Sequence, residues 1–325
     1  MSISSGVGSL PGEDYAEAVR LVLGEVPDLP FVPELPARGA SASMTGRTLA
    51  VVAELGFDLQ PAGWRLTDAP GVDHRRARSL LAQDLDGFEE QAQGYAGELK
   101  VQVAGPWTLA ATVERPRGDR LLADAGARRE LAQALAEGVG VHLADLARRV
   151  PGARLVVQVD EPALPAVLAA QVPTSSGFGR HRSVDLPAAS AALETVFAAI
   201  ERSGATSLAH CCAPGMPIGL LRGAGAHGIS LDLDVLAAED YDELGTAFDE
   251  GARVFLGVLP ALDVARVPSD RQVVERVLRL LDMLGFDHEE VAPQIVLTPA
   301  CGLAGASPGY ARTALSLVRE SAARL

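Results

Sequence analysis

Near the middle of the chain an apolar run stops abruptly at two carboxylates: RLVVQVDEP, residues 154–162. A run of this length, rich in valine and leucine, is typical of a buried strand in a parallel sheet. Similar runs recur along the chain and alternate with amphipathic stretches that have helical periodicity. The predicted strands are residues 3–9, 29–34, 99–105, 154–160, 206–211, 228–233, 253–259 and 294–299.

The segments between these runs are predicted to be helical, at about residues 12–24, 45–55, 73–96, 119–149, 186–203, 240–250, 268–284 and 307–324. Ser269 and Ser307 are expected helix caps. Eight strands alternating with helices predict an α/β fold, a (β/α)8 TIM barrel formed by residues 1–325 as a single domain. An extra helical insertion is expected between the second and third strands, with a short extended piece near residues 57–60. A doubly wound open sheet is the alternative.

Composition narrows the class of partner. Hydrophobic residues make up 48% of the 325 residues and the formal charge is −14, so a large core is available and a nucleic-acid or anionic-membrane partner is not expected. No apolar run approaches the length of a membrane span, and the first residues lack the features of a signal peptide. Three cysteines are too few for a disulfide framework, so we expect a cytoplasmic, reducing location.

Chemically active residues follow nearly every predicted strand. In a barrel the carboxyl ends of the strands meet on one face, where active sites are built. These residues are Ser9 in the run Gly8-Ser9-Leu10-Pro11, then Glu34, Asp160, His210, Cys212, Asp232, Asp234 and Cys301. The predicted site therefore lies at this face.

His210, Cys212 and Cys301 form the sharpest of these groups. An imidazole nitrogen and two thiolates are good zinc ligands, and Asp232 offers an additional oxygen. The alternative is a core histidine with two buried cysteines. Cys211 points the opposite way if the strand continues, and is interpreted as a packing residue.

Two further features have both a structural and a functional interpretation. In the strand-end pair Asp160-Glu161 a carboxylate either caps the next helix or pairs with an arginine, or it binds the ammonium group of a substrate. Arg180 and Arg182 lie in a glycine- and serine-containing loop that is either simply solvated or a flap for a carboxylate or phosphate.

With these residues in place, the sequence resembles the catalytic C-terminal barrel of the cobalamin-independent methionine synthase family. The resemblance covers nearly the whole chain in family order. It rests on Gly8-Ser9-Leu10-Pro11, Lys100 followed by Gly105-Pro106 and Thr108, Gln158-Val159-Asp160-Glu161-Pro162-Ala163-Leu164, His210-x-Cys212, Ile229-Ser230-Leu231-Asp232, Val267-Pro268-Ser269 and Pro299-Ala300-Cys301-Gly302-Leu303.

The resemblance implies a Zn²⁺ site of His210, Cys212, Cys301 and an acidic ligand. The family has glutamate where this chain has Asp232, and Asp234 is the other candidate. It also implies that Ser9, the backbone around Gly8, and Asp160 hold the amino-acid end of homocysteine, with Glu34 as a further candidate for its ammonium group. The implied activity is methyl transfer to the homocysteine thiol, which gives methionine.

The methyl donor is less well defined than the thiol. Family members that use methyltetrahydrofolate carry a second, N-terminal barrel, for which this length leaves no room, and a tryptophan where this chain has Thr112. A histidine thought to act as an acid is replaced by Asp263, the implied catalytic residue on the donor side. The expected donor is a folate or a methylcorrinoid protein.

Two competing functions stay open on the sequence. One is a metal-free barrel lyase of the uroporphyrinogen decarboxylase type, in which Arg180 and Arg182 bind substrate carboxylates. The other is a non-catalytic relative that binds zinc or an amino acid.

Overall fold

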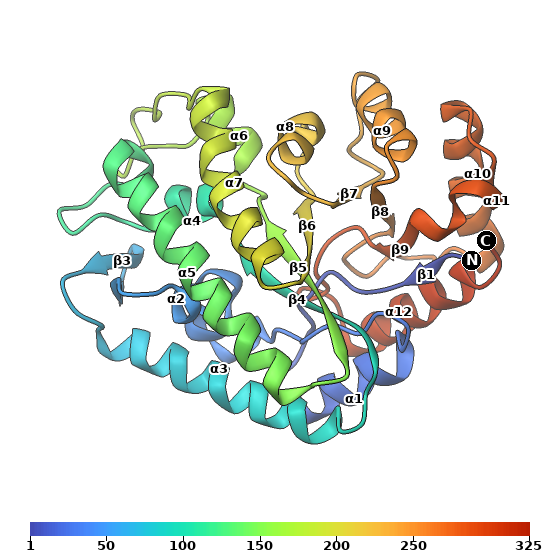
Figure 1. Cartoon of the computed structure of the whole chain (residues 1–325), viewed down its shortest axis with the longest axis horizontal. Coiled ribbons are helices and arrows are strands. Elements are labelled where there is room, and N and C mark those ends of the chain that lie inside the picture. The colour runs from blue at the N-terminus through green and yellow to red at the C-terminus, as the bar shows by residue number, and fades with distance from the viewer.

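The computed structural model describes all 325 residues and has a curled, fully parallel sheet of seven strands at its centre (Figure 1). The strand order is β1-β9-β8-β7-β6-β5-β4. The bounds are β1 Ile3–Ser4, β4 Gly97–Ala104, β5 Ala153–Asp160, β6 Thr206–Cys211, β7 Gly228–Asp232, β8 Arg253–Leu259 and β9 Ile295–Pro299. The α/β class and the parallel sheet agree with the sequence, and the curl is that of a TIM-barrel-like fold.

The predicted second strand, residues 29–34, is not a regular strand in the structure. Pro30 and Pro33 have no N–H to donate to a neighbouring strand, so only isolated bridges form. Phe31 bridges to Lys100 of β4, and Glu34 bridges to Ser9, beyond the end of β1. The segment therefore lies between the two edges of the seven-stranded sheet and positions Glu34 beside Ser9.

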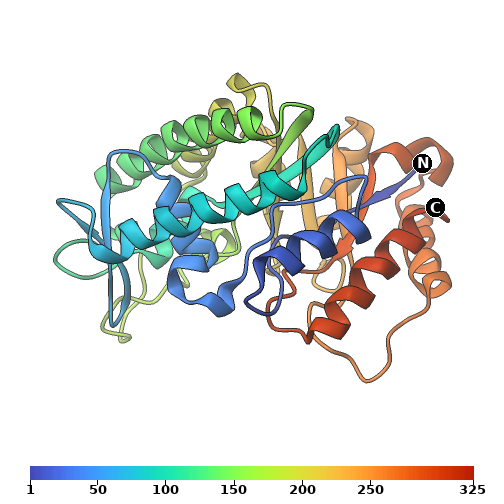
Figure 2. The ribbon, with the colours of Figure 1, turned by 90° about the horizontal axis from the view of Figure 1, so that it is seen from below.

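Helices surround the sheet (Figures 1 and 2). They are α1 Tyr15–Glu25, α2 Met44–Val51, α3 Val72–Gln91, α4 Pro106–Thr112, α5 Ala125–Arg149, α6 Leu164–Leu168, α7 Leu186–Arg202, α8 Ile218–Gly223, α9 Asp240–Asp249, α10 Asp270–Leu284, α11 His288–Val291 and α12 Pro308–Ala322, with single 3-10 turns between some of them. The caps predicted at Ser269 and Ser307 are present, and Ser269 also forms a capping box with Gln272. No helix combines the length and the apolar character that a membrane crossing requires.

The insertion between residues 35 and 96 contains α2 and α3, as expected, and also an antiparallel hairpin. Its strands are β2 Gly56–Gln60 and β3 Gly63–Thr67. The extended piece predicted near residues 57–60 is the first of these strands. The insertion is therefore mixed rather than purely helical.

Two layers of side chains fill the concave face of the sheet. A small apolar cluster forms the lower layer, from Leu29, Val156, Leu208, Phe255 and Val296. Side chains alternate between the two faces of a strand, so residues two positions further along lie on the same face. The layer above the apolar cluster thus contains polar groups, among them Gln158 and His210, and the site is built on it.

Candidate metal centre

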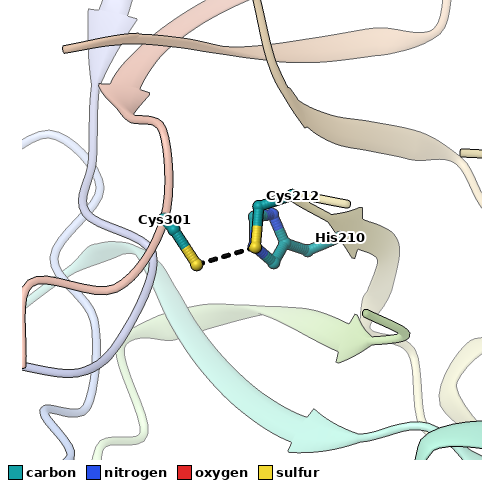
Figure 3. A group of neighbouring side chains, drawn as sticks. All are labelled: His210, Cys212 and Cys301. Carbon is teal, nitrogen blue, oxygen red and sulfur yellow. Dashed lines mark hydrogen bonds between the residues drawn. The ribbon is translucent and has the colours of Figure 1, made fainter. Parts of the chain in front are cut away.

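His210, Cys212 and Cys301 come together at the carboxyl ends of β6 and β9 (Figure 3). Their potential ligand atoms all lie within 4.8 Å of one another, and the two sulfur atoms are 2.8 Å apart. Strands β7 and β8 separate β6 from β9 in the sheet, so the group forms because the sheet curls. This is the convergence of strand ends that the sequence predicted.

The His210 ring is arranged as a metal ligand requires. Its Nδ1 lies 2.9 Å from Ser230 Oγ on the neighbouring strand β7, which fixes the plane of the ring. Its Nε2 is buried and has no hydrogen-bond partner. A buried, unpartnered imidazole nitrogen is costly unless something binds it, and a nitrogen beside two thiols fits zinc. The donor set therefore fits the metal that the sequence suggested.

The two thiols of this group differ in acidity. A hydrogen bond from Cys212 lowers the pKa of Cys301 to about 4, while the same bond and burial raise the pKa of Cys212. Cys301 is therefore the more acidic of the two thiols. The third cysteine, Cys211, is buried, and its Sγ faces the carbonyl of Ala213, in agreement with a packing role.

Neither candidate acidic ligand belongs to the group of three. Asp232 ends β7 and accepts a hydrogen bond from the backbone N–H of Asp234 at 2.8 Å. Asp234 forms an ion pair with Arg276 at 2.7 Å. Burial raises the pKa of Asp232, and the neighbouring Asp234 carboxylate adds to that shift.

A cavity of about 190 Å³ adjoins the three groups. Residues that the sequence assigned to the amino-acid end of a substrate line it together with the zinc-ligand candidates: Gly8, Ser9, Glu34, Asp160, His210, Cys212 and Cys301. Backbone hydrogen bonds hold this wall together, from Glu34 to Gly8 and from Leu303 to Ser9. The structure thus gathers seven of the predicted site residues around one cavity.

The two carboxylates of the cavity are buried and mutually repulsive. Burial raises the pKa of Glu34 to about 7 and the pKa of Asp160 to about 6. Arg47 lies 3.8 Å from Glu34 and opposes the first shift, and the Gln158 amide donates to Asp160 at 2.7 Å. A cation entering the cavity would relieve the repulsion, so the pair suits an ammonium group.

Arg180, Arg182 and Asp263 lie away from the cavity in this structure. Both arginines are exposed, and Arg180 donates to the backbone carbonyl of Gln171 at 2.8 Å. Asp263 is exposed and accepts from the backbone N–H of Ser307 at 2.7 Å, at the start of α12. Arg180 contacts its own loop, and Asp263 contacts the start of α12.

Three buried residues that support the site were assigned no role from the sequence: Lys100, Gln158 and Ser230. Gln158 precedes Asp160 by two positions in a strand, and such a spacing puts both side chains on one face. Polar residues at alternate positions of an otherwise apolar run are thus the signal that identifies supporting groups of this kind.

Glu161, the other carboxylate of the strand-end pair, acts as a helix cap. It is fully buried and accepts hydrogen bonds from the backbone N–H groups of Trp107 and Thr108, at the start of α4. Gly105 is required there, because a side chain at this position would overlap the Glu161 carboxyl group. The strand-end pair is therefore divided: Asp160 faces the cavity and Glu161 caps a helix.

Comparison with known proteins agrees with this geometry. Residues 97–324 match the family described as cobalamin-independent synthase, catalytic domain. No curated protein sequence matches the chain. Among solved structures, a B12-independent methionine synthase from Shewanella sp. W3-18-1 in complex with selenomethionine is similar at a TM-score of 0.58 and 14% identity, over 99% of this chain and 96% of that one.

A beta-galactosidase from the psychrophilic Marinomonas ef1 also covers 99% of this chain and 59% of its own, but at a TM-score of 0.47 and 10% identity. The likeness to the methionine synthase structure concerns the fold, whereas the sequence match spans more than two thirds of the chain. The chain therefore belongs to the catalytic-domain family of the cobalamin-independent methionine synthases.

Proposed function

We propose that the protein is a zinc-dependent methyltransferase that converts homocysteine to methionine. The observation that carries the proposal is the buried, unpartnered Nε2 of His210 next to the sulfur atoms of Cys212 and Cys301. Membership of the family supports the reaction class. We also propose that residues 1–325 form one (β/α)8 domain, in which the segment 29–34 takes the place of the second strand.

His210, Cys212 and Cys301 would hold the metal, with Asp232 as the proposed fourth ligand. Bound zinc lowers the pKa of a coordinated thiol, so it would supply homocysteine as the nucleophilic thiolate at neutral pH. Ser230 keeps the His210 ring in the orientation that leaves Nε2 free. The chain's own part is thus to fix three donors around one point.

The other end of homocysteine is an amino acid, and the cavity offers matching groups. Glu34 and Asp160 are the proposed partners of its ammonium group, and Ser9 with the backbone around Gly8 is the proposed partner of its carboxylate. Anchoring both ends holds the thiol in line with an incoming methyl group, and such positioning accounts for much of the rate of a bimolecular transfer. A folate or a methylcorrinoid protein is the proposed methyl donor.

Metal analysis and a transfer assay test the proposal. Purified protein should contain one zinc ion per chain, and Cys212→Ser and Cys301→Ser should lose it. Cys211→Ser is the matched control, because its thiol faces away from the group and the variant should keep the metal. Folded protein that takes up no zinc would refute the metal site.

Methionine formation from homocysteine should be measured with methyltetrahydrofolate and with methylcobalamin as separate donors. Turnover with either donor supports the activity and identifies the donor class. A zinc-loaded protein that binds homocysteine without turnover with any donor is instead the non-catalytic relative.

A further inference from the structure

The only lysine among the 28 basic residues of the chain is buried beneath the cavity. Lys100 belongs to β4 and is 0% exposed. Lysine is rarely buried without a carboxylate partner, yet Lys100 forms no salt bridge. The reason for its position must lie in the neutral groups that it contacts.

Three oxygen atoms surround the Lys100 ammonium group. Its Nζ donates to the carbonyl of Val7 and to Gln158 Oε1, both at 2.7 Å, and lies 3.5 Å from Gln102 Oε1. The ring of Phe31 lies on another side, with its centroid 5.4 Å from Nζ. An ammonium group has three N–H donors, and each of them has an acceptor here.

These contacts determine how the Gln158 amide is turned. In its ammonium form lysine has no acceptor, so the amide oxygen of Gln158 faces Lys100 and its NH₂ group faces the other way. That NH₂ group donates to Asp160 Oδ1 at 2.7 Å and to the carbonyl of Val7 at 2.9 Å. The Gln158 amide thus links Lys100 to Asp160 through two hydrogen bonds, one at its oxygen and one at its nitrogen.

We infer that Lys100 is a positioning residue for substrate binding, which locks the Gln158 amide so that the Asp160 carboxylate stays turned toward the ammonium group of an amino-acid substrate. The inference rests on the proposed function, since it concerns the ammonium end of homocysteine. Lys100 itself does not line the cavity and is not one of the three zinc-ligand candidates, but two of its partners, Val7 and Gln102, belong to the cavity wall.

The choice of lysine over arginine follows from the same geometry. Arginine supplies all the other basic residues of this chain. A guanidinium group spreads five donors over a plane, whereas the acceptors around Lys100 converge on one nitrogen atom. The ammonium group of lysine can donate to these converging acceptors from one atom, whereas the planar guanidinium group of arginine cannot.

The charges around the cavity are also consistent with this role. Burial lowers the pKa of Lys100 to about 7, and the carboxylates of Asp160 and Glu34 oppose that shift. The two carboxylates thus favour the charged form of Lys100.

A single lysine makes the arrangement directly measurable. Protein labelled with ¹⁵N at lysine Nζ gives one side-chain ammonium signal in NMR. Asp160→Asn should shift this signal in the wild-type background and should shift it much less in a Gln158→Met background, because the connecting amide is then missing. An equal shift in both backgrounds would overturn the inference, since Asp160 would then act on Lys100 without the amide. Glu130→Gln, an exposed change on α5, should leave the signal in place.

Binding of L-homocysteine to the zinc-loaded protein, measured by calorimetry, supplies the functional readout. Lys100→Met and Gln158→Met should each weaken binding about ten- to hundredfold with unchanged zinc content, as expected for an impaired hydrogen-bonded contact to a charged group. The double variant should bind no more weakly than the weaker single variant, because both changes break one chain of contacts. Arg148→Met, on an exposed face of α5, should bind as the wild type does.

Additive losses, or wild-type affinity in Lys100→Met, would overturn the inference. Failure of the wild type itself to bind homocysteine would instead refute the proposed function, and the NMR comparison would still decide whether Lys100 orients the amide. The NMR comparison also decides the case if Lys100→Met does not fold.

Discussion

Replacing Ser230 by alanine isolates the contribution of the hydrogen bond that orients His210. Ser230 is 1% exposed, and its Oγ is the partner of His210 Nδ1 at 2.9 Å. Without the hydroxyl, the buried Nδ1 has no partner and the ring is free to rotate or to change tautomer, so Nε2 is no longer held toward the two thiols. Loss of such an outer contact typically costs about 10- to 100-fold in metal affinity.

That range corresponds to about 1.4–2.8 kcal/mol. The lower end is close to the net value of one neutral hydrogen bond, about 0.5–1.5 kcal/mol. The excess over that value measures the lost control of ring orientation and tautomer. Ser230→Thr retains the hydroxyl and is expected to recover part of the affinity.

Zinc affinity should be measured by competition with a chromogenic chelator. Ser207→Ala is the matched control: Ser207 is also 1% exposed, and its Oγ donates to the carbonyl of Gly225, near the opposite end of β6 from His210. Both alanine variants lose a buried hydroxyl, but only Ser230→Ala should bind zinc more weakly. Equal zinc affinity in Ser230→Ala and the wild type would refute the orienting role.

Three other predictions concern stability and substrate binding. Gly302→Ala should weaken homocysteine binding about ten- to hundredfold without loss of zinc, because the added methyl group would displace the Ser9 hydroxyl. An unchanged affinity, measured by calorimetry, would contradict this prediction. Glu161→Gln should lower the free energy of unfolding by about 1–3 kcal/mol, because an amide has one acceptor oxygen for two backbone N–H donors at the start of α4. Urea denaturation measures this, with Glu130→Gln as the control, and equal urea midpoints of the two variants would refute it. Burial lowers the pKa of His74 below its usual 6.5, so its contribution to stability is complete above pH 6.5 and is lost as the pH falls below that value. The urea midpoint of the wild type should therefore fall more than that of His74→Gln on acidification, and parallel curves would show that His74 does not titrate on unfolding.

Much of the site was predictable because strand ends converge and side chains alternate. His210 and Cys212, two positions apart at the end of β6, had to share a face, and Cys211 had to point away from them. The same rule puts Gln158 and Asp160 on one face. These relations depend only on local backbone geometry.

The prediction was wrong or incomplete for features that depend on contacts between distant segments of the chain. Residues 29–34 have the apolar character of a strand, but their prolines leave only isolated bridges. The insertion gained a hairpin at Gly56–Thr67 that its helical periodicity did not reveal in full. Asp263 follows a strand and yet caps α12 through Ser307, a contact made 44 positions away in sequence.

The sequence by itself indicated the parallel α/β class and the candidate group His210, Cys212 and Cys301, because period and residue chemistry are local properties. The candidates for the cavity wall followed from the resemblance to the family. Only the tertiary structure decided that Cys301 meets Cys212 across 89 positions, that His210 keeps one nitrogen free, and that a buried lysine holds Gln158 against Asp160. Those relations arise when a sheet curls and burial forces every polar group to find a partner, and no single segment of the chain contains that information.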